Sequence, residues 1–385
     1  LKARVLLYAA SPLFNGNADY AKFANEDGTL LFAPKDDSKW GKAAAAAKEA
    51  IDKIEGSSYY GLYYSDEPDN GYRNYMELFL PSKKWNKEYI FARNQGTGYS
   101  DNIHQEKCMA ANGMGGWSGL CPTQELVDAY EMANGSTPII GYNADGTPII
   151  NGASGYSETG FAATAGKHYP AGVYNMYVGR EPRFYASINF NGQQWRGRQL
   201  EFWQGGKDGI NVSKVDYCCT GYLLRKTADE GVDVINGKGG MKEASILFRV
   251  GSLYLDYAEA LNEAEGPVDD VYKYVDAIRK RAGLSGLAKG LDKDKMRERI
   301  QHERQIELAF EAGHRYFDCH RWKIAEKTDN GYMHGMNITA TNKVDYSKRS
   351  TVGDSRVFEK KHYLFPIPQS EMDKQIGLVQ SPYWE

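Results

Sequence analysis

The sequence predicts a mainly α-helical protein, in which tetratricopeptide-like helix pairs (an α/α superhelical bundle) carry a loop-rich region with short β-strands. Three observations predict this fold class. Apolar residues recur at helical spacing near both ends of the chain. The middle of the chain is rich in Gly, Tyr, Asn and Pro, with only short strand-like runs. The length of 385 residues is sufficient to bury a large core.

The chain opens with two predicted helices, over residues 1–11 and 41–54, which together make residues 1–56 a helical pair of the scaffold. The first helix stops near Pro12, because proline disfavours helical backbone in the residue before it. The second is a strong helix by propensity, and Gly56 ends it. A helix that starts at the first residue, without an initiator Met or an N-cap, leads us to expect that the natural protein begins upstream. Any export signal or lipid anchor is expected in that missing part.

Residues 57–244 are expected to form a loop-rich, variable ligand-binding region. Strand-like runs are predicted at 89–92, 183–188 and 222–224, and one short helix over 123–131. Loops of this length are uncommon in compact domains and are usually functional.

From residue 245 the pattern becomes helical again. Apolar residues from Val250 to Leu261 follow i, i+3, i+4 spacing, and the same spacing returns from Val271 to Ala282 after a turn at Gly266. Two amphipathic helices joined by a tight turn look like a tetratricopeptide unit. A third helical stretch is predicted over 293–322. We therefore assign 245–325 to tetratricopeptide-like helices and 326–385 to an extended C-terminal tail packing on the scaffold.

Composition and motifs exclude several classes of protein. The net charge of −3 and the pI near 6.2 provide no basic field for nucleic acid. The sequence has no phosphate-binding loop, nucleophile elbow or dinucleotide fingerprint, so we expect no catalysis and no cofactor. A zinc motif beginning at His302 fails because position 306 is Ile, and we expect no metal. The odd count of five cysteines is not a disulfide scaffold, although Cys108 and Cys121 flank a Gly-rich loop and have the option of pairing.

The densest charge cluster lies in residues 303–321. Its carboxylates Glu303, Glu307 and Glu311 fall four apart on one helix face. Local arginines are spaced to pair with carboxylates of the cluster: Arg304 lies three before Glu307, Arg315 four after Glu311, and Arg321 three after Asp318. Glycoside hydrolysis needs two carboxyl groups that face each other across the bond, whereas local pairs at this spacing indicate a structural ladder. A glycoside hydrolase remains the alternative from a different functional class.

Aromatic residues in the loops are the better candidates for a binding site. Tyr99 and Trp117 lie in a Gly- and Asn-rich stretch, residues 95–121, and Trp195 and Trp203 lie in residues 191–211. Asn and Gln side chains and Arg198 are close to the second pair. Flat rings beside amide and guanidinium donors suit sugar recognition, and they suit a peptide equally well. We rank Trp117 and Trp203 first, then Trp195, because Phe190 and Leu200 are placed to fold over it, and Tyr99 fourth.

Several motifs resemble one known family. Residues 249–263 (RVGSLYLDYAEALNE), 278–284 (IRKRAGL) and 303–318 (ERQIELAFEAGHRYFD) closely resemble the signature helices of the SusD/RagB family. The tail at 364–368 (LFPIP) with 380–382 (QSP), and the stretches 8–16, 180–185 and 220–226, fit as well. Two departures are an inserted-looking Ala312 and a Ser at 381, where Asn is more usual.

The resemblance implies a non-enzymatic cell-surface nutrient receptor on the extracellular face of the outer membrane of Bacteroidetes-type bacteria. It implies an oligosaccharide ligand, with a peptide or glycopeptide as the alternative, and a SusC-like TonB-dependent transporter as partner. It also implies an N-terminal lipid anchor that is not present in this chain, together with the family's first helices. The matched motifs belong to the scaffold, so they do not identify binding residues.

Overall fold

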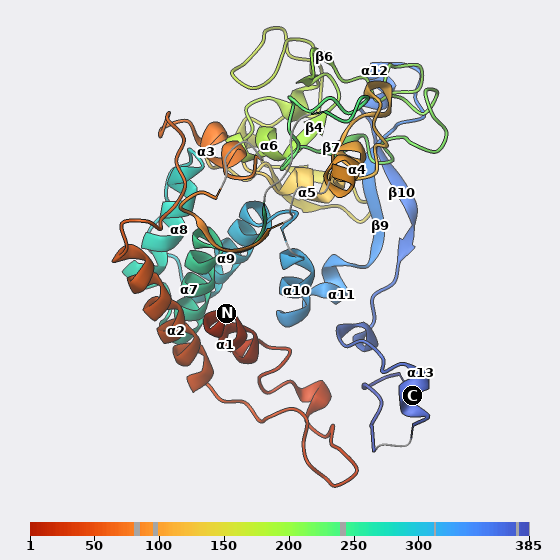
Figure 1. The fold of residues 1–385 in the computed structure, drawn as a ribbon. Coiled ribbons are helices and arrows are strands. Elements are labelled where there is room, and N and C mark those ends of the chain that lie inside the picture. The colour runs from red at the N-terminus through yellow and green to blue at the C-terminus, as the bar shows by residue number, and fades with distance from the viewer. Residues whose placement is uncertain (81–84, 95–98, 239–243, 312, 375–376, 385) are drawn as a thin grey trace.

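Helices from the two ends of the chain pack side by side into a helical frame (Figure 1). The computed structural model describes residues 1–80, 85–94, 99–238, 244–311, 313–374 and 377–384. The frame consists of α1 (Lys2–Ala10), α2 (Ser38–Glu55), α7 (Val250–Glu265), α8 (Asp269–Arg281) and α9 (Lys293–Glu307). The helices predicted at 1–11 and 41–54 and the helix pair around Gly266 are therefore confirmed. The tetratricopeptide-like fold class is confirmed with them.

The core of the frame forms around α7, because this helix is buried along most of its length. Small residues on α2 and α7, such as Ala47 and Ala258, let these two helices approach closely. The rings of Tyr254 on α7 and Tyr274 on α8 meet edge to face, with centroids 4.7 Å apart. The apolar spacing seen in the sequence is thus the buried seam of the frame.

The loop-rich region lies above the frame in Figure 1, and its short elements connect long irregular segments. It contains α3 (Gly71–Leu78), α4 (Tyr99–Met109), α5 (Gln124–Ala129), α6 (Pro182–Ser187), β1 (Tyr89–Asn94), β2 (Ile139–Tyr142), β3 (Pro148–Ile150), β4 (Ile188–Phe190), β5 (Gln194–Trp195), β6 (Arg198–Gln199), β7 (Tyr222–Leu224) and β8 (Ala244–Arg249). The strands form antiparallel pairs, β1 with β8, β2 with β3, β4 with β7 and β5 with β6. An aromatic core that includes Tyr177, Phe184 and Phe190 holds the region together.

Residues 183–188 correct the sequence-based prediction of a strand. They form helix α6, which begins at Pro182, where the missing N–H and fixed φ of proline suit the first turn of a helix. The strand starts only at Ile188, where β4 pairs with β7 through Ile188 and Leu224. Proline was therefore the decisive local signal.

The single helical stretch predicted over 293–322 is wrong as well, because the chain breaks between α9 and α10 (His314–Arg321). Phe310 and Gly313 both have left-handed backbone, with φ of +62° and +73°. The C-terminal part contains more structure than an extended tail. It forms α11 (Ala325–Thr328), β9 (Gly331–Met336), α12 (Lys343–Tyr346), β10 (Arg349–Arg356) and α13 (Gln369–Met372), with β9 and β10 in an antiparallel hairpin.

A buried network of charges fastens the loop-rich region to the frame. The carboxylate of Glu307 on α9 accepts hydrogen bonds from Arg249 (2.9 Å), from Arg281 and, across to α6, from Arg183 (3.1 Å). Burial alone would raise the pKa of Glu307, but these three guanidinium charges outweigh it and lower the pKa to about 2. Glu307 is therefore ionised and fully paired in the folded protein.

Glu311 extends this network to Lys226, which follows β7. It accepts hydrogen bonds from Arg249 Nε (2.7 Å) and from Lys226 Nζ (2.6 Å). Burial lowers the pKa of Lys226 to about 8, while the opposing charge of Glu311 limits that decrease. The network therefore joins α7, α8 and α9 to segments of the loop-rich region that are far away in sequence.

The charge cluster at 303–321 is thus structural, but most of its predicted partners are wrong. Arg304 pairs with Asp318 (2.9 Å) and Asp256 (2.7 Å) in place of Glu307. The expected pair of Arg321 with Asp318 is present at 2.8 Å. The cluster is mainly a set of long-range buried contacts, because the last turns of α9 bury Glu303, Arg304 and Glu307 against other elements.

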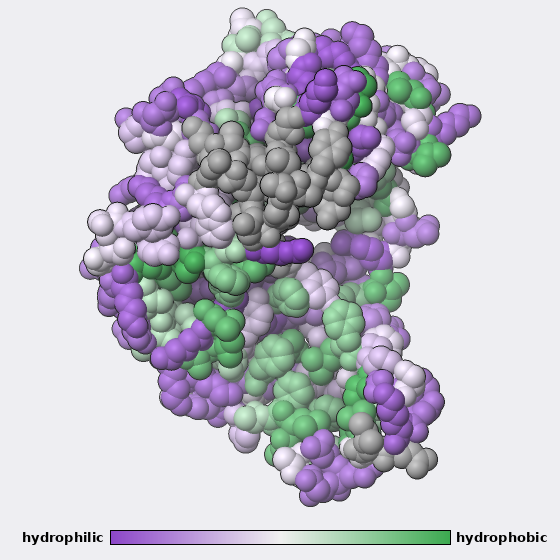
Figure 2. Space-filling view, in the orientation of Figure 1, coloured by the Kyte–Doolittle hydropathy of each residue, from purple (hydrophilic) through white to green (hydrophobic). Residues whose placement is uncertain are grey.

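The face seen in Figure 2 is mainly hydrophilic over the loop-rich region, while apolar residues gather on the inner side of the lower half. A small apolar cluster that joins the segment after α1 to the C-terminal part contains Leu13, Tyr20, Cys319, Ala325 and Tyr363. No helix within the described residues is both long enough and apolar enough to cross a membrane.

Candidate functional site

The aromatic residues predicted as ligand contacts lie in separate environments. Trp117 is 37% exposed and stacks on His104 of α4, with ring centroids 5.3 Å apart, while Lys107 Nζ lies 5.4 Å from its ring centroid. Trp203 is half-buried against the loop-rich core. Tyr99 begins α4, but its side chain lies outside the part that the structure describes. Trp117 and Trp203 remain candidates for ligand contact.

Two other predicted contacts are engaged within the fold. Trp195 is only 2% exposed and belongs to the aromatic core, so its ring packs in the interior and leaves the candidate set. Phe190 and Leu200 lie in the same cluster. Arg198 makes a two-pronged ion pair with Asp208, at 2.7 and 2.6 Å, which occupies the guanidinium edge that a ligand would need.

The structure reveals a different site, a cleft made of two adjoining cavities of about 310 and 360 Å³. Both cavities are lined by Tyr72, Lys167, His168 and Tyr169, and we call the combined space the Tyr72 cleft. Further lining residues of the first cavity are Gly166, Pro170, Gln193, Gln194 and Arg225. The volume suits a small part of a polymer, such as one or two sugar rings.

A close backbone approach positions Tyr72. It follows Gly71, the first residue of α3, where a Cβ atom would lie 2.2 Å from the carbonyl oxygen of Ala282 at the end of α8. Only glycine permits this contact, and α3 is thereby held against the frame. Tyr72 consequently points from a fixed helix and not from a free loop.

A hairpin-like loop, residues 161–174, supplies the opposite part of the lining. Its base is closed by a bridge between Phe161 and Tyr174, and near its tip the Gly166 N–H donates to the Tyr169 carbonyl (2.9 Å). The imidazole of His168 stacks on Tyr72, with ring centroids 4.7 Å apart and planes 28° from parallel. Tyr169 in turn stacks on buried Tyr185 at 6.1 Å. These rings offer a flat aromatic surface to the cavity.

Polar groups without protein partners lie beside the rings. Gln193 Oε1 and Arg225 Nε are buried and have no hydrogen-bond partner. Burial raises the pKa of Tyr72, so its hydroxyl stays protonated while it accepts a hydrogen bond from Arg225. Burial, together with the charges of Lys167 and Arg225, lowers the pKa of His168 to about 4. The imidazole is therefore neutral at pH 7 and provides one donor and one acceptor.

Sequence reasoning missed this cleft for an identifiable reason. The run Lys167-His168-Tyr169-Pro170 is a local signal, since it combines a cation, two rings and a turn former inside a long loop. Tyr72 and Arg225 carry no such signal. They reach the cleft only through the packing of α3 and of the segment after β7.

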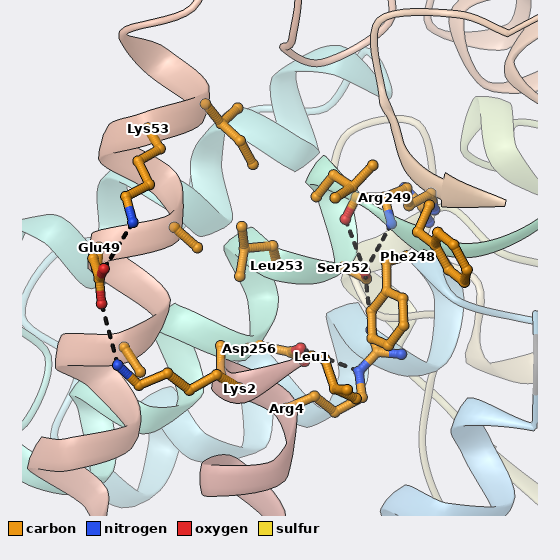
Figure 3. Close-up of a pocket in the computed structure, with 16 residues that line it drawn as sticks. Leu1, Lys2, Arg4, Glu49, Lys53, Phe248, Arg249, Ser252, Leu253 and Asp256 are labelled. Atoms are coloured by element: carbon orange, nitrogen blue, oxygen red, sulfur yellow. Dashed lines mark hydrogen bonds and ion pairs between the residues drawn. The ribbon is translucent and has the colours of Figure 1, made fainter.

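A larger cavity, about 500 Å³, lies elsewhere, between α1, α2 and the start of α7 (Figure 3). Its charged groups already pair with one another. Glu49 accepts from Lys2 (3.3 Å) and Lys53 (2.8 Å), and Arg4 donates to Asp256 at 3.5 Å. The remaining wall is largely apolar, which gives a hydroxyl-rich ligand few groups to bond. The Tyr72 cleft is therefore the better candidate.

All five cysteines are free, so Cys108 and Cys121 form no disulfide in this structure, and Cys121 Sγ lies 4.0 Å from Cys218 Sγ. Within the described residues, His, Cys, Asp and Glu side chains form no group of three that would hold a metal ion.

Comparisons with known proteins agree on one family. A model described as the SusD family matches residues 80–384. Two curated relatives come from Formosa agariphila. "SusD-like protein P25" is 42% identical over 82 residues, and "SusD-like protein P2" is 29% identical over 154 residues. These matches span 20% and 37% of this chain but only 15% and 26% of those proteins.

Solved structures give the same result for the fold. The protein BT4246 matches 100% of this chain and 70% of its own length, at 27% identity and a TM-score of 0.80. A SusD-like protein (BF3747) from Bacteroides fragilis matches 99% of this chain and 70% of its own length, at 24% identity and a TM-score of 0.65. A "SusD-like carbohydrate binding protein" (BF0978) from the same organism matches 87% of this chain and 60% of its own, at 23% identity and a TM-score of 0.64.

Proposed function

The chain belongs to the SusD family, and from this membership we propose that it is a cell-surface receptor that binds an oligosaccharide without cleaving it. In this proposal the receptor is held at the extracellular face of the outer membrane by an N-terminal lipid anchor. It passes its ligand to a SusC-like TonB-dependent transporter. The family, and the carbohydrate-binding relative that shares this fold, support the proposal.

The observation that carries the ligand class is the pairing of flat rings with unsatisfied polar atoms in the Tyr72 cleft. The rings of Tyr72 and Tyr169 suit the C–H faces of a sugar, and both lie on rigid supports. Gln193 and Arg225 line the first cavity, and Gln193 Oε1 and Arg225 Nε have no hydrogen-bond partner in the protein. A ligand with an apolar face and a hydroxyl rim satisfies both sets at once.

Binding without catalysis is supported by the acids around the cleft. The residues that line its two cavities include one with a carboxyl group, Asp69. Glycoside hydrolysis uses two carboxyl groups that face each other across the bond. The carboxylates of Glu303, Glu307 and Glu311 are occupied by buried arginines and a lysine. All three are engaged in ion pairs inside the molecule and do not line the cleft.

Isothermal titration of the purified chain against glycan and peptide panels tests the proposal. We expect binding to at least one glycan, and at least a tenfold loss of affinity in Tyr72→Ala and Tyr169→Ala. Tyr332→Ala, which removes an exposed ring from β9, serves as the matched control. Binding to peptides alone would contradict the glycan assignment. Release of shorter sugars during incubation would show a hydrolase instead.

A further inference from the structure

Among the described residues, Arg225 differs from the other buried arginines in having neither a carboxylate partner nor a set of backbone carbonyls around its guanidinium. Within the described residues, the buried arginines that pair with carboxylates are Arg183, Arg249, Arg279, Arg281, Arg304 and Arg321. Arg180 is held by three backbone carbonyls instead. Arg225, at 7% exposure, makes one side-chain hydrogen bond, to the hydroxyl of Tyr72. A guanidinium has five N–H donors, so most of its edge is unused.

The surroundings of Arg225 fix its position without neutralising its charge. Its guanidinium carbon lies 4.7 Å from the ring centroid of Trp195 and 5.4 Å from that of Tyr72. Aromatic faces attract a cation and hold its plane, but they carry no net negative charge. A buried, unbalanced cation is costly, and the cost falls when an anion binds to it.

A second cation, Lys167, adds to the positive charge of the cleft, and the nearby carboxylates do not cancel it. Lys167 lines both cavities, and its charge, together with that of Arg225, helps to lower the pKa of His168 to about 4, after burial as the main cause. On the negative side, Asp69 lines only the second cavity. Glu230, whose charge acts on Tyr72, is exposed and accepts the backbone N–H of Arg196 at 2.9 Å. The first cavity therefore combines two cations with no lining carboxylate.

We infer that the ligand of the Tyr72 cleft is an acidic glycan, whose carboxylate or sulfate group binds the free N–H edge of Arg225 while a sugar face packs on the rings. A carboxylate and a sulfate ester share the planar or near-planar oxygen pair that a guanidinium binds in two-pronged fashion. Lys167 contributes a second, more mobile positive charge. This inference rests on the proposed glycan-binding function and specifies its substrate class.

A matched pair of ligands provides the test. Oligogalacturonate and its methyl ester have the same sugar rings and linkages, but only the first carries carboxylates. Titration at low ionic strength is expected to show at least tenfold tighter binding of the acid form. A sulfated galactan oligosaccharide is the third arm and separates sulfate from carboxylate recognition. Neutral malto- and xylo-oligosaccharides of equal length form the fourth arm.

Variants of the chain locate the effect. Arg225→Gln is expected to reduce affinity for the acidic ligand at least tenfold and to leave affinity for the neutral ligand within about threefold. Lys167→Gln changes an exposed residue and is expected to reduce the preference for the acidic ligand about threefold. It tests the inference even if Arg225→Gln fails to fold. Lys374→Gln removes one exposed cation from α13 and controls for net charge.

The possible outcomes distinguish failure of this inference from failure of the proposed function. Tighter binding of the acid form that Arg225→Gln or Lys167→Gln reduces supports the inference, whether carboxylate or sulfate is preferred. Equal binding of the acid and its ester, or binding of neutral sugars alone, overturns it and leaves the glycan receptor intact. Binding of acidic peptides with no glycan overturns the proposed function itself.

Discussion

Arg225 and Lys226 are neighbours in the chain, but their side chains point in different directions, one to the Tyr72 cleft and the other to the buried charge network. Both backbone N–H groups donate to the carbonyl of Ser187, at 2.8 and 3.2 Å. Lys226 Nζ points inward to the Glu311 carboxylate (2.6 Å) and the Ala309 carbonyl (2.8 Å), whereas Arg225 lines the Tyr72 cleft. The buried charge network and the cleft are thus joined through a single peptide unit.

Glu307→Gln is expected to lower the free energy of unfolding by about 3–5 kcal/mol, because it leaves buried arginines without a full partner. Chemical denaturation measures the change. Ligand affinity of the folded fraction should stay the same, since Glu307 does not line the cleft. The control is Asp52→Asn, whose ion pair with Lys48 is half exposed and worth about 0.5 kcal/mol or less. A large affinity loss without loss of stability would place Glu307 in the binding site.

Acid is expected to unfold the protein through the same carboxylates. The pKa values of Glu307 and Glu311 are about 2 in the folded protein and near 4.5 when unfolded. Between these values the unfolded chain binds more protons, so stability falls as pH decreases from about 5 to 2. Each group contributes roughly 3 kcal/mol to the loss. Denaturation midpoints from pH 7 to 2.5 test this, and a flat profile would show that the pairs are weaker than their geometry implies.

Trp195→Ala and Trp117→Ala test whether each ring stabilises the core or is available to bind a ligand. Truncating Trp195 in the core is expected to cost about 3–5 kcal/mol of folding stability. Truncating exposed Trp117 should change stability by roughly 0.5 kcal/mol or less. Thermal melts and titrations of both variants decide the matter. Trp117 is a ligand anchor only if its loss also weakens binding by about 2 kcal/mol or more.

Gly71→Ala tests whether the glycine contact positions the cleft. The added Cβ would lie 2.2 Å from the Ala282 oxygen, so the backbone of α3 must move. We expect a loss of about 1–3 kcal/mol in stability, together with weaker ligand binding, because Tyr72 moves with α3. Gly61→Ala is the control, since nothing lies within 4 Å of a Cβ there. Unchanged affinity in Gly71→Ala would separate Tyr72 from the site.

The frame was predictable because its information is local. Apolar periodicity located α7 and α8, and propensity located α2. The secondary-structure predictions were wrong where neighbouring residues favour different conformations. The alternation of apolar and polar residues from Arg183 to Ile188 favours a strand, but Pro182 starts a helix there. The left-handed backbone at Phe310, between α9 and α10, has no signal in the sequence, since aromatic residues rarely adopt positive φ.

The candidate site was less predictable, because exposure and pairing are properties of the whole fold. The sequence ranked Trp117 above Trp195 but kept both as candidates, and only the packing shows that Trp117 is exposed and Trp195 is buried. The sequence around Arg225 resembles that around any paired arginine. Its proposed role follows from the fact that no carboxylate of the described residues pairs with it, and this can be known only from the positions of all elements that surround it.

The charge network sets a condition on engineering this protein by exchange of binding loops. A transplanted loop-rich region has to bring cations equivalent to Arg183 and Lys226, or the acidic residues of α9 and its C-terminal extension remain buried and unbalanced. Chimeras that match only loop lengths and anchor points are expected to accumulate as insoluble protein. Those that retain both cations should fold and allow specificity to be transferred.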